Sequence, residues 1–235
     1  MDIEHNGSST NSIPESGEEF NLFQSTGQPR LGAQPQSDNK INWKLLREAC
    51  LSNDVFTNSE SDVLKQKSPL CNNMLHIAAS LGNDELVKKV IPKAPHLLTE
   101  ENFNGDTALH VAAKCGHFPV LESLIFGHFK IFQEALDKIL IKNKLGNTFF
   151  HEAIINGDEE ELLSLLSHFN EVSKRATLLE INNEKKSGLY LAIEAGYKQL
   201  IDKALSEEIM QDSNFVTRGK SPLLAAILKQ DEGTY

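Results

Sequence analysis

The residues of this chain whose types and spacing could support chemistry are a His-Glu pair, a Gly-Lys-Ser run and three cysteines. His151-Glu152 matches the start of the H-E-x-x-H helix motif, in which two histidines bind zinc and the glutamate acts as a general base. The second histidine position holds Ile155, so only one zinc ligand remains on that helix face. Gly219-Lys220-Ser221 ends like a phosphate-binding loop, but Asn214 stands where that motif requires its first glycine.

The cysteines also give no catalytic or metal-binding pattern. Cys50, Cys71 and Cys115 are widely spaced and form no C-x-x-C pair, so neither a zinc site nor a disulfide framework is predicted. The sequence places no base beside any of them, and a nucleophile without a partner base does not argue for catalysis. We therefore predict that the chain is not an enzyme and has no catalytic, cofactor-binding or metal-binding residues.

Charge and hydropathy limit the kinds of binding partner and the cellular compartments that the sequence predicts for this protein. The formal net charge of -10 argues against nucleic acid as the main partner, because phosphate binding requires a basic face. The first residues lack the basic and apolar blocks of a signal peptide. Since no stretch approaches about 18 uncharged apolar residues, no direct membrane span is predicted in this chain. These features favour a cytoplasmic protein.

A short phrase recurs along the chain and indicates the elements that position these residues. Leu-His-Ile-Ala-Ala around His76 returns around His110, and weaker copies surround His151, Tyr190 and Leu224. The steps between these five positions are 34, 41, 39 and 34 residues. A period of about 33 residues with this phrase is the signature of ankyrin repeats, and the longer steps require only modest insertions. The resemblance to ankyrin proteins implies that the recurring histidine braces the turns between neighbouring repeats rather than taking part in chemistry.

Each repeat is predicted to hold two helices joined by tight turns. In the second repeat Thr107 is the predicted N-cap of a helix over residues 108–114, which stops at Gly116, a natural left-handed residue. A second helix follows, and its apolar residues recur on one helix face. The predicted stripes are Leu86, Val87, Val90 and Ile91; Leu121, Leu124 and Ile125; Leu162, Leu163, Leu165 and Leu166; and Leu200, Ile201, Ala204 and Leu205.

The repeats predict an all-α fold, an ankyrin-repeat solenoid of helix-turn-helix units with hairpin-like tips and a disordered N-terminal tail. Only the first helix of a fifth repeat precedes Tyr235, so we expect a truncated product, an alternative transcript or a chain that borrows its cap from another molecule. The predicted segments are a tail over 1–40, a capping repeat and loop over 41–70, and repeats over 71–235, divided at about 71–103, 104–141, 145–181, 185–217 and a partial 218–235.

Five stretches carry a resemblance to a narrower family: residues 73–82, 95–98, 105–114, 144–148 and 188–196. Through them the chain resembles the plant membrane-tethered ankyrin proteins, which include the accelerated-cell-death and salt-tolerance ankyrin proteins. The resemblance implies a repeat block that faces the cytosol and a link to defence and stress signalling. In that family a C-terminal domain follows, which opens with Pro-Gly-Gly and holds several membrane spans. This sequence contains no such domain.

The leading hypothesis is therefore a non-catalytic protein-protein interaction module. The alternative is a truncated or regulatory form of a membrane-spanning, channel-like or receptor-like ankyrin protein, held at the plasma membrane through longer relatives. The partner is predicted to be a protein of unknown identity, with related ankyrin membrane proteins as one candidate. We expect the contacts on exposed positions of the turn tips and first helices, and the candidate residues are Asn102, Asn104, Asp106, Lys114, Lys142, Lys144, Asn147, Glu184, Lys185 and Lys186.

Overall fold

The computed structural model describes residues 50, 63–133, 135–206 and 219–220. The predicted tail over 1–40, most of the predicted capping repeat, the residue Asn214 and the partial fifth repeat from Ser221 onward lie outside the described residues.

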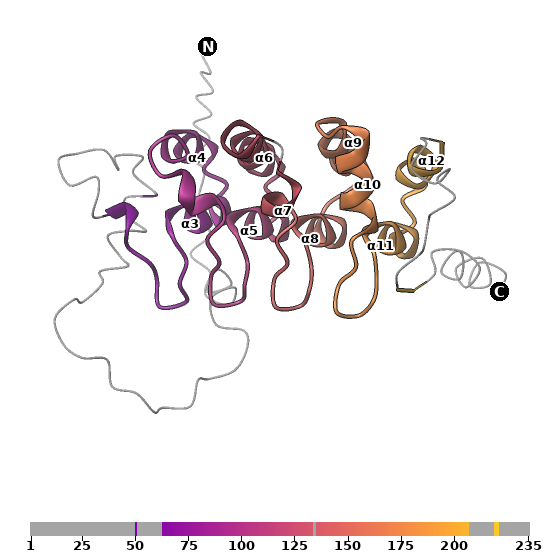
Figure 1. Ribbon diagram of the computed structural model, residues 1–235, viewed down its shortest axis with the longest axis horizontal. Helices are drawn as coiled ribbons and strands as arrows, with labels where there is room; N and C mark the ends of the chain where they lie inside the picture. The colour runs from indigo at the N-terminus through magenta and orange to yellow at the C-terminus, as the bar shows by residue number, and fades with distance from the viewer. Residues whose placement is uncertain (1–49, 51–62, 134, 207–218, 221–235) are drawn as a thin grey trace, which may run out of the picture. The chain divides into compact units, whose positions relative to one another are not determined.

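The described residues form four pairs of helices that follow one another in chain order (Figure 1). We call the first helix of each pair the inner helix and the second the outer helix. Each inner helix packs against the next inner helix, and each outer helix packs against the next outer helix. The inner helices are α3 (Met74–Ser80), α5 (Ala108–Lys114), α8 (Phe149–Asn156) and α11 (Gly188–Ala195), and the outer helices are α4 (Asp84–Val90), α6 (Phe118–Phe132), α9 (Glu159–Ser167) and α12 (Lys198–Ser206).

Short third helices follow the first three outer helices and account for the unequal repeat lengths. They are η1 (Pro95–Leu98), α7 (Leu136–Ile139) and α10 (Glu171–Leu179). The 41-residue step contains the fifteen-residue α6 and then α7, and the 39-residue step contains α10. These segments were expected only as insertions, because their apolar residues are too few to show a helical period.

The predicted apolar stripes supply the core between the helix layers. The outer-helix residues Leu86, Leu121, Leu124 and Leu162 are each 0% exposed. Burying one such side chain contributes about 1.5–3 kcal/mol, so the stacked repeats share one continuous core. Every predicted stripe residue that the structure describes is buried, except that Leu163 and Ile201 are only partly buried. Leu205 lies outside the side chains that the structure describes.

The fold class predicted from the sequence is confirmed in the part of the chain that the structure describes. This part is helical, and its extended backbone pairing is limited to one isolated bridge between Ile181 and Ser187. Thr107 caps α5, the helix ends at Lys114, and Gly116 adopts a left-handed φ of +67°, as predicted.

Four loops with one common backbone pattern project from the same side of the helix layers, and Figure 1 shows them as a row of hairpins. The fourth residue of each loop adopts a positive φ: Cys71 (60°), Gly105 (74°), Gly146 (75°) and Lys185 (64°). Glycine adopts this conformation without steric cost, whereas a residue with a side chain does so under strain. We call these loops the tip loops, and they span residues 68–72, 102–106, 143–147 and 182–186.

Replacing Cys71 by glycine is expected to stabilise the protein. The left-handed conformation costs a non-glycine residue about 1–2 kcal/mol, and the added freedom of glycine in the unfolded chain offsets about half of the gain. We expect Cys71→Gly to raise the free energy of unfolding by about 0.5–1 kcal/mol, measured by urea denaturation. Cys71→Ala is the control, because alanine keeps the strain; an equal gain from that variant would contradict the explanation.

Candidate functional site

Three buried histidines join each tip loop to the next one. In His110 the Nδ1 atom accepts the backbone N–H of Thr107 (3.2 Å), and the Nε2–H donates to the carbonyl of Asn147 (2.9 Å) in the following tip loop. His76 and His151 repeat this geometry, and their Nε2 atoms bond the carbonyls of Asp106 (2.8 Å) and Lys186 (3.2 Å). The predicted role of these histidines as turn braces is confirmed.

The same histidines stay neutral at physiological pH. Burial lowers the pKa of His76 and of His151 to about 4, because the interior disfavours the charged imidazolium. Burial also lowers the pKa of His110. The neutral ring has one donor and one acceptor, and both are used in the brace.

Asparagines that open the tip loops add a second set of bonds between repeats. Within its own loop Asn143 Oδ1 accepts the backbone N–H of Leu145 (3.0 Å) and of Asn147 (3.1 Å). Its Nδ2 donates to Asp106 Oδ1 (2.9 Å) in the preceding loop. Asn102 and Asn182 repeat this pattern, with Nδ2 donating to Asn72 Oδ1 and Asn147 Oδ1, both at 2.9 Å. These bonds hold the tip loops in one arrangement.

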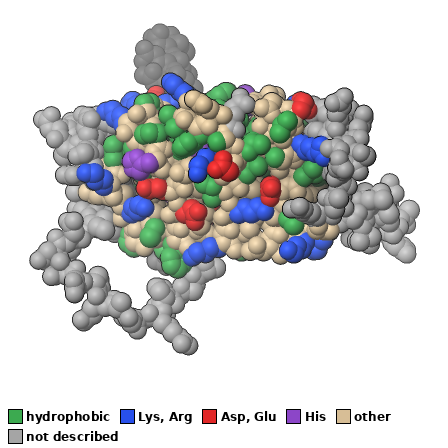
Figure 2. All heavy atoms as spheres, in the orientation of Figure 1, with side chains coloured by type: hydrophobic (Ala, Val, Ile, Leu, Met, Phe, Trp, Pro, Cys, Tyr) green, Lys and Arg blue, Asp and Glu red, His purple; other side chains and the backbone are tan. Residues whose placement is uncertain are grey.

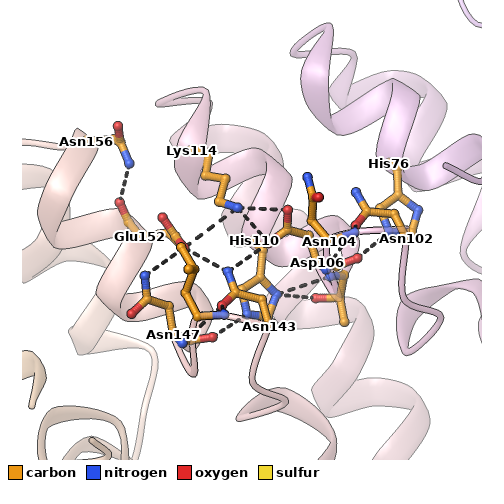
Figure 3. Close-up of polar contacts among 12 residues, drawn as sticks. His76, Asn102, Asn104, Asp106, His110, Lys114, Asn143, Asn147, Glu152 and Asn156 are labelled. Atoms are coloured by element: carbon orange, nitrogen blue, oxygen red, sulfur yellow. Dashed lines mark hydrogen bonds and ion pairs between the residues drawn. The ribbon is translucent and has the colours of Figure 1, made fainter. Parts of the chain in front are cut away.

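A buried cluster of charged groups lies between the second and third repeats (Figure 3). Lys114 Nζ donates to both carboxylate oxygens of Asp106, at 2.7 and 2.8 Å. Glu152 Oε1 lies 3.7 Å from the same ammonium and accepts Nδ2 of Asn143 (2.9 Å) and of Asn147 (3.0 Å). Both carboxylate side chains are almost fully buried, so the single ammonium balances two acids that solvent scarcely reaches.

This cluster of charged groups stabilises the stacking of the repeats, and it does not act as a catalytic site. Asp106 and Lys114 lie eight positions apart in the second repeat, and the equivalent positions of the fourth repeat hold Lys186 and Glu194. There the base comes first and the acid second, and the two side chains form an ion pair of 2.8 Å. In the third repeat the same positions hold Asn147 and Ile155, which carry no charge. The contact that joins the two repeats is Asn143 Nδ2, which donates to both Asp106 and Glu152.

The ten candidate contact residues separate into three groups in the structure: two are buried, three are lysines in ion pairs, and five are exposed or half-buried. Asp106 and Asn147 are only 2% and 5% exposed, so the expectation that all ten lie on the surface is wrong for these two. Their side chains are buried because the next tip loop covers them, a contact that one repeat alone does not reveal. The ammonium groups of Lys114, Lys142 and Lys186 are engaged in ion pairs with Asp106, Glu180 and Glu194.

The remaining candidates face solvent or its edge. Asn104, Lys144, Glu184 and Lys185 are exposed, and Asn102 is half-buried in the loop that it organises. Partner binding by any of the ten residues stays a prediction.

Three exposed apolar residues on this side of the molecule were missed by sequence reasoning. Phe103, Leu145 and Ile155 are 48%, 63% and 57% exposed, respectively. Phe103 and Leu145 lie in neighbouring tip loops, and Ile155 lies on the inner helix α8. The Lys144 ammonium lies 4.2 Å above the centre of the Phe103 ring and links the two loops. Aligning the repeats would have revealed these residues, because they are large apolar side chains at loop and helix positions that face solvent.

We define the tip face as the surface formed by the tip loops and the exposed sides of the inner helices. It joins exposed apolar groups to lysine ammonium groups on loops that internal hydrogen bonds fix in place. Such a surface can bind another macromolecule without rearranging.

The described residues provide few groups for other chemistry. Among them, no set of three or more His, Cys, Asp and Glu side chains is arranged to hold a metal ion. Burial raises the pKa of the Cys50 thiol to about 12 and also raises that of Cys115, which suppresses the nucleophilic thiolate. The helices seen in this part of the chain are all too short or too polar to cross a bilayer.

Comparison with known proteins agrees with the repeat pattern. A family model described as ankyrin repeats (3 copies) matches residues 48–131 and 75–176. Protein ACCELERATED CELL DEATH 6 of Arabidopsis thaliana is 36% identical over 139 residues, which cover 56% of this chain and 20% of that protein. The resemblance to the accelerated-cell-death ankyrin proteins is confirmed, and the chain spans about a fifth of the length of this curated relative.

A solved structure shares the fold at lower sequence similarity. One chain from the complex of a predatory endopeptidase of Bdellovibrio bacteriovorus with an immunity protein aligns with a TM-score of 0.57 and 22% identity. The alignment covers 83% of this chain and 95% of that chain. At this identity the likeness concerns the fold alone.

Proposed function

Because this chain belongs to the ankyrin-repeat family, we propose that it is a non-catalytic protein-interaction module whose partner binds the tip face. Stacked repeats present an extended surface of this kind, and partners bind through a few residues that supply most of the energy. The observation that carries the proposal is the exposure of the apolar side chains of Phe103, Leu145 and Ile155 on the tip face. Exposed apolar groups of this size favour burial by a partner.

The fixed geometry of the tip loops supports the same function. A loop that must become ordered on binding loses affinity, whereas a loop that is already ordered does not. The histidine braces and the asparagine bonds order the loops that carry Phe103 and Leu145 before a partner arrives. We therefore propose that Phe103 and Leu145 are the principal contacts, with Lys144 and Lys185 beside them.

We expect Leu145→Asp to weaken capture of the partner by at least about tenfold, because the aspartate cannot be buried without a counter-charge. The measurement is affinity capture from native extract with quantitative mass spectrometry, comparing the proteins bound by the unchanged chain and by the variant. Val172→Asp is the matched control, since Val172 is 71% exposed on α10, away from the tip face. Equal losses from both variants, or a loss from Val172→Asp alone, would contradict the proposed face.

We further propose that the interaction serves plant stress or defence signalling at the cytoplasmic side of the plasma membrane. The name of the Arabidopsis relative supports the defence role. The membrane setting rests on the resemblance to the plant membrane-tethered ankyrin proteins alone. Longer ankyrin membrane proteins are the partners that the alternative hypothesis requires, with this chain as a regulatory or truncated form. Fractionation of native cells with an antibody against the chain tests it: a band at 26.1 kDa in the membrane fraction supports docking on longer relatives, and the same band restricted to the soluble fraction contradicts it.

A further inference from the structure

Lysines gather on the tip loops of the later repeats although the chain as a whole is acidic. The segments 141–147, 180–186 and 219–220 together carry five lysines and two glutamates, whereas the chain has a formal net charge of -10. Figure 2 shows Lys and Arg side chains along the lower edge of the molecule, where Figure 1 places the tip loops. A local positive surface on an acidic protein attracts groups of negative charge.

Three of these lysines, Lys144, Lys185 and Lys220, have no acidic partner among the described residues. Lys142 pairs with Glu180 at 2.6 Å, and Lys186 pairs with Glu194 at 2.8 Å. Lys144 and Lys185 are exposed, and neither makes an ion pair in the part of the chain that the structure describes. The two ammonium groups are thus free to pair with carboxylates from another molecule.

The position of Lys144 also indicates which chemical group of a bound partner lies next to the carboxylate that pairs with this lysine. Its ammonium lies 4.2 Å from the centre of the Phe103 ring, and Leu145 is its neighbour in the same loop. A ligand group that reaches Lys144 therefore lies beside two exposed apolar side chains. A carboxylate followed closely by an apolar side chain satisfies both at once.

We propose that the partner of the tip face is an acidic peptide segment, in which Asp or Glu residues adjoin Leu, Ile or Phe residues. The carboxylates pair with Lys144 and Lys185, and the apolar side chains cover Phe103 and Leu145. This inference rests on the proposed function, because it names the chemistry of the partner on the same face.

The surface fits a peptide better than a membrane or a nucleic acid. Glu184 Oε2 lies 3.6 Å from the Lys186 ammonium, Glu180 pairs with Lys142, and Glu101 directly precedes the second tip loop, so acids are interspersed among the lysines. A bilayer of anionic lipids or a phosphate backbone presents uniform negative charge, which these acids repel. A peptide can place its carboxylates opposite the lysines and avoid the glutamates.

The test is selection of random short peptides by display on the full-length chain, followed by affinity measurement with a fluorescein-labelled copy of the most enriched peptide. We expect enriched peptides to carry Asp or Glu next to Leu, Ile or Phe. Lys144→Glu should lower the affinity for the labelled peptide by at least about tenfold. Raising the salt concentration from about 0.05 to about 0.5 M should lower the affinity of the unchanged chain severalfold. The matched control is Lys89→Glu, an exposed lysine on the outer helix α4, which should change the affinity less than about twofold.

The outcomes separate this inference from the function on which it rests. If the enriched peptides lack acidic residues but still lose binding to Leu145→Asp, the proposal of an acidic partner is wrong and the tip face remains the proposed binding surface. Enriched peptides whose binding is unaffected by both Leu145→Asp and Lys144→Glu would overturn the face as well. Co-sedimentation of the chain with phosphatidylserine vesicles that disappears in Lys144→Glu would overturn the peptide in favour of a membrane surface.

Discussion

Acidification from about pH 7 to about pH 4 is expected to unfold the repeats, because buried histidines must gain protons that the folded state excludes. Burial lowers the pKa of His76, His128 and His151 from 6.5 to about 4, and it lowers that of His110 as well. His128 lies on α6 against the Phe132 ring, and the other three form the braces between tip loops.

The sign of the effect follows from these directions. Between pH 6.5 and about 4 the unfolded chain binds more protons than the folded chain, so stability is present above pH 6.5 and is lost as the pH falls through this window. As the pH falls through this window, each of the three histidines with a pKa of about 4 lowers the free energy of unfolding by about 3 kcal/mol. Together they rival the whole stability of about 5–15 kcal/mol of a typical domain.

The measurement is urea denaturation followed by circular dichroism at several pH values. The free energy of unfolding should fall steeply below about pH 6, and His128→Leu should reduce the slope because one group no longer titrates. Partial burial raises the pKa of Glu100, but its hydrogen bonds to Asn73 and Lys67 outweigh burial and lower that pKa below 4.5. Glu100 therefore adds to the loss of stability as the pH falls below about 4.5. A free energy of unfolding that stays constant from about pH 7 to about pH 4.5 would contradict neutral, buried histidines.

Replacing Lys114 by isoleucine is expected to destabilise the protein by about 3–5 kcal/mol, the cost of removing one partner from a buried ion pair. Asp106 and Glu152 would then lie in the interior with Asn143 donating to both of them and no cation nearby. Two carboxylates in that position repel each other. The change is measured as the shift in urea midpoint at neutral pH.

The third repeat provides the matched rescue for this variant. It holds Asn147 and Ile155 where the second repeat holds Asp106 and Lys114, and the Asn147 Oδ1 atom accepts the Nδ2–H of Asn182. The double variant Asp106→Asn, Lys114→Ile reproduces these two positions, and the introduced asparagine can still accept from Asn143. We expect it to recover about half of the lost stability, because one of the two unbalanced charges is removed while Glu152 keeps its buried charge. If the double variant is as unstable as Lys114→Ile alone, the loss comes from packing rather than from unbalanced charge.

The sequence was sufficient to predict the features that recur in every repeat. The phrase around His76 and His110 fixes the repeat length, and the caps and apolar stripes follow from local rules of helix formation. The histidine brace was expected from the resemblance to ankyrin repeats, and in the structure its partner lies one repeat further along the chain.

The features that differ between repeats could not be predicted in the same way. Asp106 and Asn147 are polar residues in turns, which local rules place at the surface, yet the asparagine of the next loop covers each of them. Burial here is set by stacking, which one repeat does not encode. The exposure of Phe103 and Leu145 was not predicted, because apolar side chains are generally buried, although a position-by-position comparison of the loops identifies them.

The most direct test of the tip face is photo-crosslinking in native cells, with a photoreactive amino acid introduced separately at Leu145 and at Val172. Both side chains are well exposed, and Leu145 lies on the tip face whereas Val172 lies on α10. We predict a crosslinked protein partner from position 145 and none from position 172. A partner crosslinked from position 172, with none from position 145, would contradict the claim that this chain binds its partner through the tip loops and inner helices.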